Sequence, residues 1–235
     1  MKPVIKSEWT KFISSNWCVA GVFIALLLQP ILLFAGLSFS DVPTANLALE
    51  QMLQALYISQ IGIVIMSASF FGEEYFDSSL RTTFLSNSRR TNVLVAKVLI
   101  LATISLLVGA TSIGLGISIA LLHNVYFAFY DFGKVALTMF SWVMIGWISG
   151  FIAVILKSHI ITISIIIPLL LAVNQLLVTL SITFRFLPDI AMRNAFTIYP
   201  NEILLTTQVG VLTQLIWVFA MGAVAIWLNS LRDVK

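Results

Sequence analysis

The chain of 235 residues has little charge and only one cysteine. Charged residues make up 10% of it and hydrophobic residues 60%, whereas a soluble domain usually carries about a quarter charged residues. So little charge cannot cover the surface of a water-soluble protein of this length, which excludes an ordinary soluble domain. The lone Cys18 excludes an intrachain disulfide. The net charge of +3 gives no reason to expect nucleic-acid binding.

The missing charges are concentrated in long windows. Asp, Glu, Lys and Arg are all absent from Phe12–Ser40, Gln51–Gly72, Val98–Tyr130, Val135–Leu156, Ser158–Phe184 and Ile203–Leu231. Each window can hold the ~20 apolar residues that a helix needs to cross ~30 Å of hydrocarbon. We therefore predict an all-α integral membrane protein, a single transmembrane domain over residues 1–235. Its six spanning helices are expected near residues 17–37, 53–71, 98–122, 135–156, 160–180 and 209–228.

The distribution of basic residues predicts the orientation. Six spans place both termini on one side, and ten of the 13 Lys and Arg residues fall on that side. Only Lys134, Arg185 and Arg193 fall on the other side. The positive-inside rule then makes both termini and the loop over residues 72–97 cytoplasmic. The first apolar run is longer than a signal-peptide core, so we expect it to remain as the first span.

The N-terminal residues 2–13 have an amphipathic pattern. Apolar residues recur at helical spacing on one face, and three lysines occupy the other. This pattern is typical of a helix that lies in the headgroup region, with Trp9 as an interface anchor. The alternative is a basic flank that only sets topology. We favour the interfacial helix.

Residues 72–97 form the most charged segment of the chain. Three acidic residues come first and four basic residues follow, with aromatic and leucine side chains among them. Asp77 and Arg81 lie four residues apart and can pair on a short helix. The apolar ridge of such a helix in water favours docking of a partner protein. The alternative is a solvated loop that packs on the ends of its own spans.

The segments predicted on the outer side of the membrane contain fewer candidate functional residues. The first loop, residues 38–52, carries no predicted chemistry. In the longer segment 181–208, Arg185, Asp189 and Arg193 are spaced by four, which predicts a charge ladder on one helical face. We expect one or two short helices there at the outer interface.

Two features predict close helix packing. Gly146 and Gly150 form a small-xxx-small pair on the fourth span, which favours close helix approach. The link between the fourth and fifth spans is only about three residues, 157–159, so these spans should form a tight antiparallel pair. Neither feature requires a functional role.

No energy source is apparent within the chain. The sequence contains no P-loop and no dinucleotide-binding glycine motif, so we expect no ATP binding by this polypeptide. The pair Glu73–Glu74 is a poor match to a membrane protease, because His123 and His159 fall on opposite sides of the membrane and cannot share one metal with it. The predicted spans hold no ionisable Asp, Glu, Lys or Arg of the kind that couples transport to ions. Energy for transport is therefore expected from a partner.

Three features of the chain occur in a recognisable order. They are the opening IKSEWTKF, the stretch FGEEYFDSSLRTTFLSNSRRTNVLVAKVL after the second span, and the long outer segment before the last span. Together they resemble the type-2 ABC transporter permeases, the six-span membrane subunits of bacterial exporters, which include the lantibiotic-immunity and bacitracin-resistance permeases. In the second feature, the matching positions are Glu74, Leu80, Arg81, Ser88, Arg89 and Lys97.

The resemblance implies a half-transporter in a bacterial cell membrane. Two permease chains, identical or paralogous, would pair within membrane lipid, and each would rest on one of two copies of a cytoplasmic ABC ATPase. That ATPase would bind ATP and Mg²⁺, so this chain is expected to bind no cofactor and not to be an enzyme. The residues implied in coupling are Glu74, Tyr75, Phe76, Asp77, Leu80, Arg81, Phe84 and Arg89. The polar residues implied along the pathway are Gln29, Gln60, Asn174 and Gln175.

The expected cargo is an amphipathic or antimicrobial peptide or a hydrophobic antibiotic. A compact chain without a large soluble insert resembles the immunity and multidrug branch, and an apolar interior suits such a cargo. The alternatives are a permease for a lipid or polysaccharide, and a stand-alone secondary transporter or channel.

Overall fold

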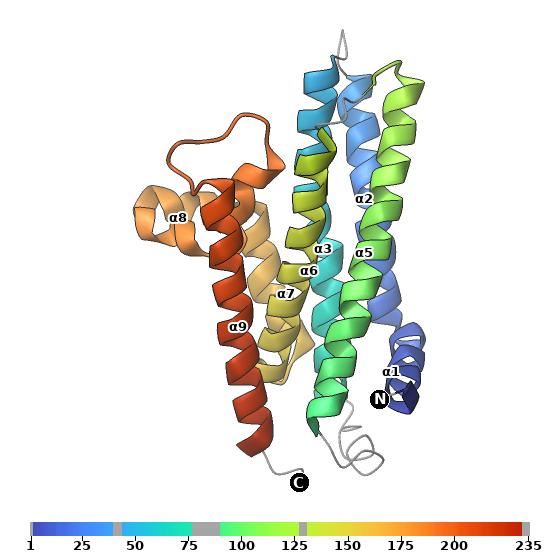
Figure 1. Ribbon diagram of the computed structural model, residues 1–235, viewed down its shortest axis with the longest axis vertical. Coiled ribbons are helices and arrows are strands. Elements are labelled where there is room, and N and C mark those ends of the chain that lie inside the picture. Colours follow the sequence, from blue (N-terminus) through green and yellow to red (C-terminus); the bar gives the residue numbers. More distant parts are fainter. Residues whose placement is uncertain (1, 40–43, 77–89, 127–130, 232–235) are drawn as a thin grey trace.

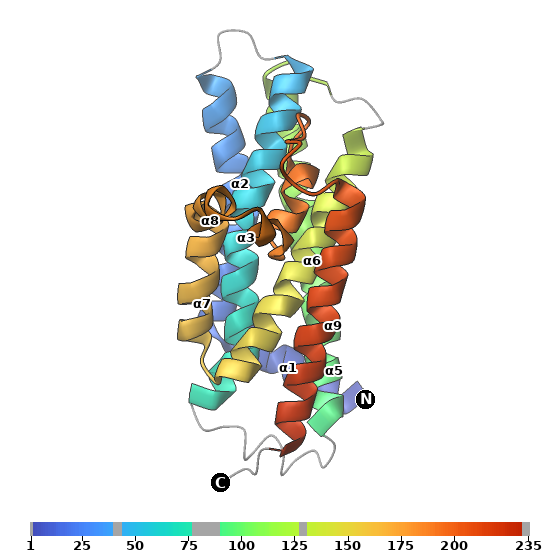
Figure 2. The same ribbon diagram turned by 90° about the vertical axis from the view of Figure 1, so that its left-hand side faces the viewer.

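The computed structural model describes residues 2–39, 44–76, 90–126 and 131–231. Within these residues the chain is helical and contains no strand. Five helices are long and apolar enough to cross a membrane. They are α2 (Asn16–Ser38), α3 (Ala45–Phe76), α5 (Arg90–Leu122), α6 (Asp131–Leu156) and α9 (Thr207–Leu231). They contain five of the six predicted spans and lie side by side in Figures 1 and 2, as in a multi-pass membrane protein.

The fifth predicted span, residues 160–180, is not one long helix. It is divided into α7 (His159–Pro168), a π-helical turn η1 (Leu169–Val173) and α8 (Asn174–Leu180). Pro168 cannot donate a backbone hydrogen bond, and proline and π-helical turns both kink helices. In Figure 1, α7 runs beside the bundle and α8 turns across it. The described residues thus contain five long helices and this broken segment, and not the six regular spans predicted.

The two ends of the bundle have different elements. We name one the α1 end: α1 (Lys2–Ser14) lies there beside α5, and α3 and α9 also end there (Figures 1 and 2). We name the opposite end the loop end; the first residues of α3 and α9 lie on that side of the molecule (Figures 1 and 2). Because α7 and the chain after it run back toward the loop end before α9 begins, the first and last helices share the α1 end.

Helices α2 and α3 approach each other through glycines. A Cβ atom at Gly21 would lie 2.8 Å from the Gly62 carbonyl oxygen, and one at Gly62 would lie 2.6 Å from the Gly21 carbonyl oxygen. Such contact between backbones is possible only without side chains, and small residues are the usual means of close packing between membrane helices.

Helix α6 packs against α3, as its predicted small-residue pair suggested. A Cβ atom at Gly146 would lie 3.2 Å from Ile63, and one at Gly150 would lie 2.8 Å from Phe71, both on α3. The Trp142 indole nitrogen of α6 donates to the carbonyl oxygen of Leu56 at 3.1 Å. These contacts place α3 at the centre of the molecule, packed against α2 on one side and α6 on another.

The segment between α8 and α9 enters the bundle. It contains two 3₁₀ helices, η2 (Ile182–Phe186) and η3 (Ile190–Phe196). The Gln214 amide donates to the carbonyl oxygen of Pro188 at 2.8 Å, and the Trp217 indole nitrogen donates to that of Phe186 at 2.8 Å. At 1.5 Å per residue, these two side chains lie about 10 and 15 Å along α9 from its start at Thr207. The predicted short helices therefore exist, but they lie well below the loop end.

Candidate functional site

A buried ion pair joins three helices at the α1 end. Glu8 of α1 is 1% exposed and Lys97 of α5 is 5% exposed. The Lys97 Nζ atom lies 3.5 Å from Glu8 Oε2 and donates to the carbonyl oxygen of Phe70, on α3, at 2.6 Å. It also lies 4.6 Å from the centre of the Phe70 ring, a cation–π contact. One buried ammonium group therefore holds α1, α3 and α5 together.

Helix α1 presents a mixed surface to its surroundings. Its Phe12 ring is buried and meets the Phe70 ring edge to face, with centroids 5.2 Å apart. Trp9 and Ile13, on the predicted apolar face, stay exposed in the chain. One buried and one exposed apolar face suit a helix that packs on the bundle with the first and lies against lipid with the second. The Lys11 ammonium lies 2.7 Å from Glu8 Oε1 and completes the charge pairing.

The predicted coupling residues lie partly within the described chain. Glu74, Tyr75 and Phe76 form the last turn of α3, and the half-buried Tyr75 packs against the core. The remaining five lie outside the described residues: Asp77, Leu80, Arg81, Phe84 and Arg89. The described neighbours of this stretch are the end of α3 and the start of α5, the two helices that Lys97 ties together.

The predicted pathway residues lie on three different helices, α2, α3 and α8. Gln29 on α2 is fully buried and its Oε1 accepts from the Ser112 hydroxyl of α5 at 3.2 Å. Gln60 on α3 is 1% exposed, and neither polar atom of its amide has a hydrogen-bond partner. Asn174 and Gln175 begin α8. Neither Gln29 nor Gln60 lines the cavity described next, and the role of all four residues along a pathway stays a prediction.

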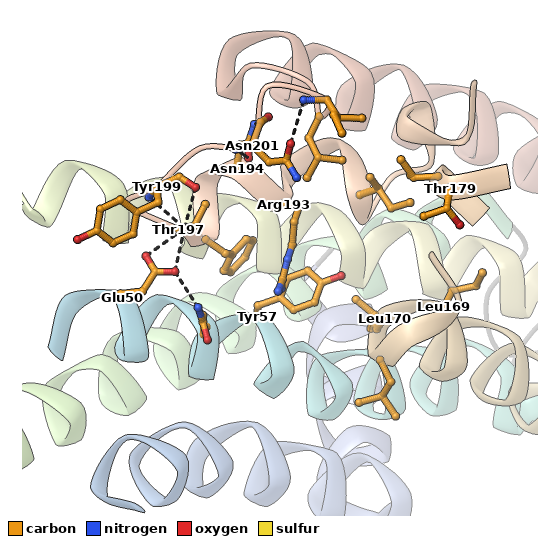
Figure 3. A pocket seen from close by; sticks show the side chains of 17 residues that line it. Glu50, Tyr57, Leu169, Leu170, Thr179, Arg193, Asn194, Thr197, Tyr199 and Asn201 are labelled. Atoms are coloured by element: carbon orange, nitrogen blue, oxygen red, sulfur yellow. Dashed lines mark hydrogen bonds between the residues drawn. The ribbon is translucent and has the colours of Figure 1, made fainter. Parts of the chain in front are cut away.

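A cavity of about 430 Å³ opens near the loop end. It lies between α3, the broken segment around η1 and α8, and the stretch from η3 to Leu204 (Figure 3). At its centre, the Arg193 guanidinium lies over the Tyr57 ring, with Cζ 4.0 Å from the ring centroid. The predicted charge ladder is wrong in form, because Arg185 and Arg193 belong to separate short helices, with Asp189 between them.

Asp189 is a buried carboxyl group beside this arginine. It is 4% exposed and interacts with the side chains of Tyr57 and Arg193. Burial disfavours the charged form and raises the pKa of Asp189 to about 6, although its backbone hydrogen bonds and Arg193 oppose the rise. Its Oδ2 atom has no hydrogen-bond partner. The interior of the folded chain therefore contains ionisable groups, although the predicted spans contain none.

Two polar networks shape the rim of the cavity. The Glu50 carboxylate accepts from the Thr197 hydroxyl at 2.8 Å and from the Ile198 backbone nitrogen at 2.6 Å. The Asn194 amide donates to the carbonyl oxygens of Asn201 and Leu205 and accepts from the Asn201 backbone nitrogen. The Glu50 bonds hold the returning chain against α3, and the Asn194 bonds join two parts of the returning chain to each other. Glu50 therefore has a structural role that the sequence did not predict.

Sequence reasoning missed Glu8, Tyr57 and Glu50. A signal existed for Glu8, because it is the sole acidic residue among the first 40. No comparable signal existed for Tyr57, which lies in an apolar span and acquires its partners from residues more than 130 positions away. Among the described residues, no three His, Cys, Asp or Glu side chains converge as a metal site would require.

No family model matches the chain, and no curated protein matches it. The class of this protein therefore rests on its fold. Over the part of the chain that the structure describes, the secondary structure is helical, with five helices of membrane-spanning length.

Proposed function

We propose that this chain is the permease subunit of an ATP-driven exporter in a bacterial cell membrane, paired with a second permease chain and coupled to separate ATPase subunits. The buried Glu8–Lys97 pair is the observation that carries the proposal. It unites α1, α3 and α5 into one mechanical unit at the α1 end. Helices α3 and α5 flank the segment 77–89, which contains most of the predicted coupling residues.

The lengths of the flanking helices support this role. Helices α3 and α5 contain 32 and 33 residues. At 1.5 Å per residue they extend about 50 Å, against ~30 Å of hydrocarbon. A force applied to the segment between them would act on two long, stiff levers. Because Lys97 fastens α1 to both, the three helices would move as a rigid body between two packed states.

Retention of the ATPase tests the proposal. The chain is co-expressed with the candidate ATPase, solubilised in detergent and purified through a tag on the permease. Arg81→Glu or Phe84→Asp should lose the ATPase, because the first reverses a charge and the second introduces one in the predicted docking segment. Arg185→Glu, at the opposite part of the fold, is the matched control and should retain it. Equal retention by all variants, with unchanged export, would contradict the coupling assignment.

A stand-alone secondary transporter is the second candidate function, and a specific observation favours it. Asp189 and Arg193 place a titratable pair inside the fold, and buried ionisable groups in membrane proteins often serve ion coupling. Uptake or efflux in vesicles without ATP, driven by a proton gradient and abolished by Asp189→Asn, would support this function. Transport that requires ATP hydrolysis by the partner would exclude it.

The cargo belongs to the same proposal. We expect an amphipathic or antimicrobial peptide or a hydrophobic antibiotic, because the five long helices present a largely apolar interior. Sensitivity of a deletion strain to a panel of such compounds measures this directly. Restored resistance by the wild-type gene, and failure of Lys97→Met to restore it at equal expression, is the expected result.

A further inference from the structure

The cavity near the loop end has a polar wall and an apolar wall. The polar wall is formed by Glu50, Gln54, Arg193, Thr197, Tyr199 and Asn201. The apolar wall is formed by Leu169, Leu170, Leu171, Val178, Ile203 and Leu204. Figure 3 shows Glu50, Thr197 and Tyr199 on one side, Leu169 and Leu170 on the other, and Arg193 with Tyr57 between them. Its volume of about 430 Å³ lies within the usual range of small-molecule sites.

The polar groups on the rim are already engaged within the protein. Glu50 accepts hydrogen bonds from Thr197 and Ile198, and the Asn194 amide is bonded to the chain at Asn201 and Leu205. They are held in place by these bonds, so the rim is a preformed structure and not a set of loose side chains.

Arg193 differs from these groups. Its guanidinium is stacked on the Tyr57 ring, and a stacked guanidinium keeps its N–H donors directed outward in its own plane. Among the described residues, no carboxylate lies within salt-bridge distance of it; Asp189 interacts with it electrostatically but does not line the cavity. A cation held on a ring between a polar and an apolar wall is suited to an anionic group attached to an aliphatic chain.

We propose that this cavity binds an amphiphile with an anionic head, whose phosphate or carboxylate lies on Arg193 and whose aliphatic chain lies along Leu169–Leu171. The exposed Leu171 and Ile203 at the rim provide an apolar route by which such a chain enters. This site does not depend on how transport is powered, because it is formed by residues remote from the α1 end.

Three soluble probes separate the contributions of head and chain. Octyl phosphate carries both, octyl glucoside carries the chain with an uncharged head, and inorganic phosphate carries the head alone. Each is titrated into the full-length protein held in amphipol, and binding is followed by calorimetry. Octyl phosphate should bind at least about tenfold more tightly than octyl glucoside, which cannot form a charge-assisted hydrogen bond with Arg193. It should also bind at least about tenfold more tightly than inorganic phosphate, which has no aliphatic chain to bury. Equal binding of octyl phosphate and octyl glucoside, or no binding at all, overturns the proposal.

A matched pair of arginine variants locates the site. Arg193→Gln should lower the affinity for octyl phosphate about tenfold, to that for octyl glucoside. Arg185→Gln is the control, because Arg185 also lies over an aromatic ring, that of Phe186 at 5.2 Å, but does not line the cavity. Equal losses in the two variants overturn the assignment to this cavity.

A second variant keeps the test decisive if Arg193→Gln does not fold, as judged by gel filtration. Arg193→Lys retains the charge and should keep a preference for octyl phosphate over octyl glucoside; loss of that preference in a folded protein contradicts the role of the charge. Displacement of octyl phosphate by a short-chain phosphatidylglycerol would identify membrane lipid as a source of the ligand. If phosphatidylglycerol does not displace octyl phosphate, the natural ligand is a soluble amphiphile.

Discussion

At the scale of single residues, the chain buries ionisable groups at two places, and these differ in how completely the groups are paired. Near the α1 end, Lys97 and Glu8 form an ion pair that is completed by Lys11 and by the carbonyl oxygen of Phe70. Between η2 and η3, the buried Asp189 has one carboxylate oxygen without a hydrogen-bond partner. A buried charge that loses its partner is costly, and one that is only partly paired shifts its pKa. Each site therefore makes a prediction of its own.

Replacing Lys97 by methionine should destabilise the protein strongly. The change leaves the Glu8 carboxylate buried without its partner on α5, and such a loss typically costs about 3–5 kcal/mol. Lys11→Met is the control: the Lys11 side chain is 35% exposed, so its charge is the better hydrated of the two and its removal should cost less than that of Lys97. Both are measured by denaturant unfolding in micelles. Losses of similar size would show that the buried pair is not the anchor of α1.

The stability of the protein should fall as pH rises from about 4 to about 6. Asp189 has a pKa of about 6 in the folded chain, above its ordinary value of 3.8, so the folded state binds more protons than the unfolded state in this window. The expected total loss is about 3 kcal/mol, complete above pH 6. Asp189→Asn should remove this decline in thermal unfolding, whereas the exposed Glu202→Gln should keep it. A decline of unchanged size in Asp189→Asn would refute the assignment.

At the scale of elements, packing depends on where backbones touch. Gly62 of α3 lies against the backbone of Ala25 on α2, so an added methyl group meets atoms that cannot move aside. Gly114 of α5 faces open space, where nothing lies within 4 Å of an added Cβ. Both glycines lie within long helices, so the difference between them is whether another helix contacts the position.

Alanine at the two positions should therefore have opposite effects. Gly62→Ala should separate α2 from α3 and lower the free energy of unfolding by about 1–3 kcal/mol or more. Gly114→Ala should leave it unchanged or raise it by up to about 1 kcal/mol, because alanine is the better helix former. Thermal unfolding in the same detergent compares them. A destabilised Gly114→Ala variant, or a neutral Gly62→Ala variant, would contradict the packing described.

The broken segment is the element in which sequence and structure differ most. Irregular backbone at membrane depth is tolerated where protein covers it. For the irregular chain that follows the broken segment, Gln214 and Trp217 of α9 supply that cover by bonding the carbonyl oxygens of Pro188 and Phe186. Gly210 of α9 allows the close approach, since a Cβ there would meet the carbonyl oxygen of Ala191. Helix α9 is thus the support for the entering segment, as well as a spanning helix.

At the scale of the whole molecule, both terminal helices lie at the α1 end, and the distribution of basic residues predicts that this end is cytoplasmic. Labelling with a membrane-impermeant maleimide tests the orientation in a Cys18→Ala background. Ser7→Cys, exposed on α1, should react in inverted vesicles and not in intact cells. Glu202→Cys, exposed near the loop end, should react in intact cells. The reverse pattern would invert the topology and remove the basis for docking a cytoplasmic ATPase.

Much of this architecture follows from composition alone. A charge-free window of about 20 residues must leave water, and a helix satisfies its own hydrogen bonds there, so five spans could be predicted to within a few residues at most boundaries. Helix α3 begins at Ala45, eight residues before its predicted span, because hydropathy marks the limits of the apolar region and not those of the helix. Glu50 and Gln54 continue the helix, joined by a side-chain hydrogen bond of 2.7 Å.

The cavity and the buried pairs could not be predicted in this way. Hydropathy adds up residues along the chain, so residues 160–180 scored as a span although Pro168 and the π-helical turn end the regular helix. The sequence predicted Arg193 as part of a charge ladder with Arg185 and Asp189, whereas the fold brings it onto the Tyr57 ring. The linear order of residues is enough to assign a segment to lipid or water, because that choice depends on local composition. Which buried groups meet depends on contacts between distant segments, and these exist only once the helices have packed.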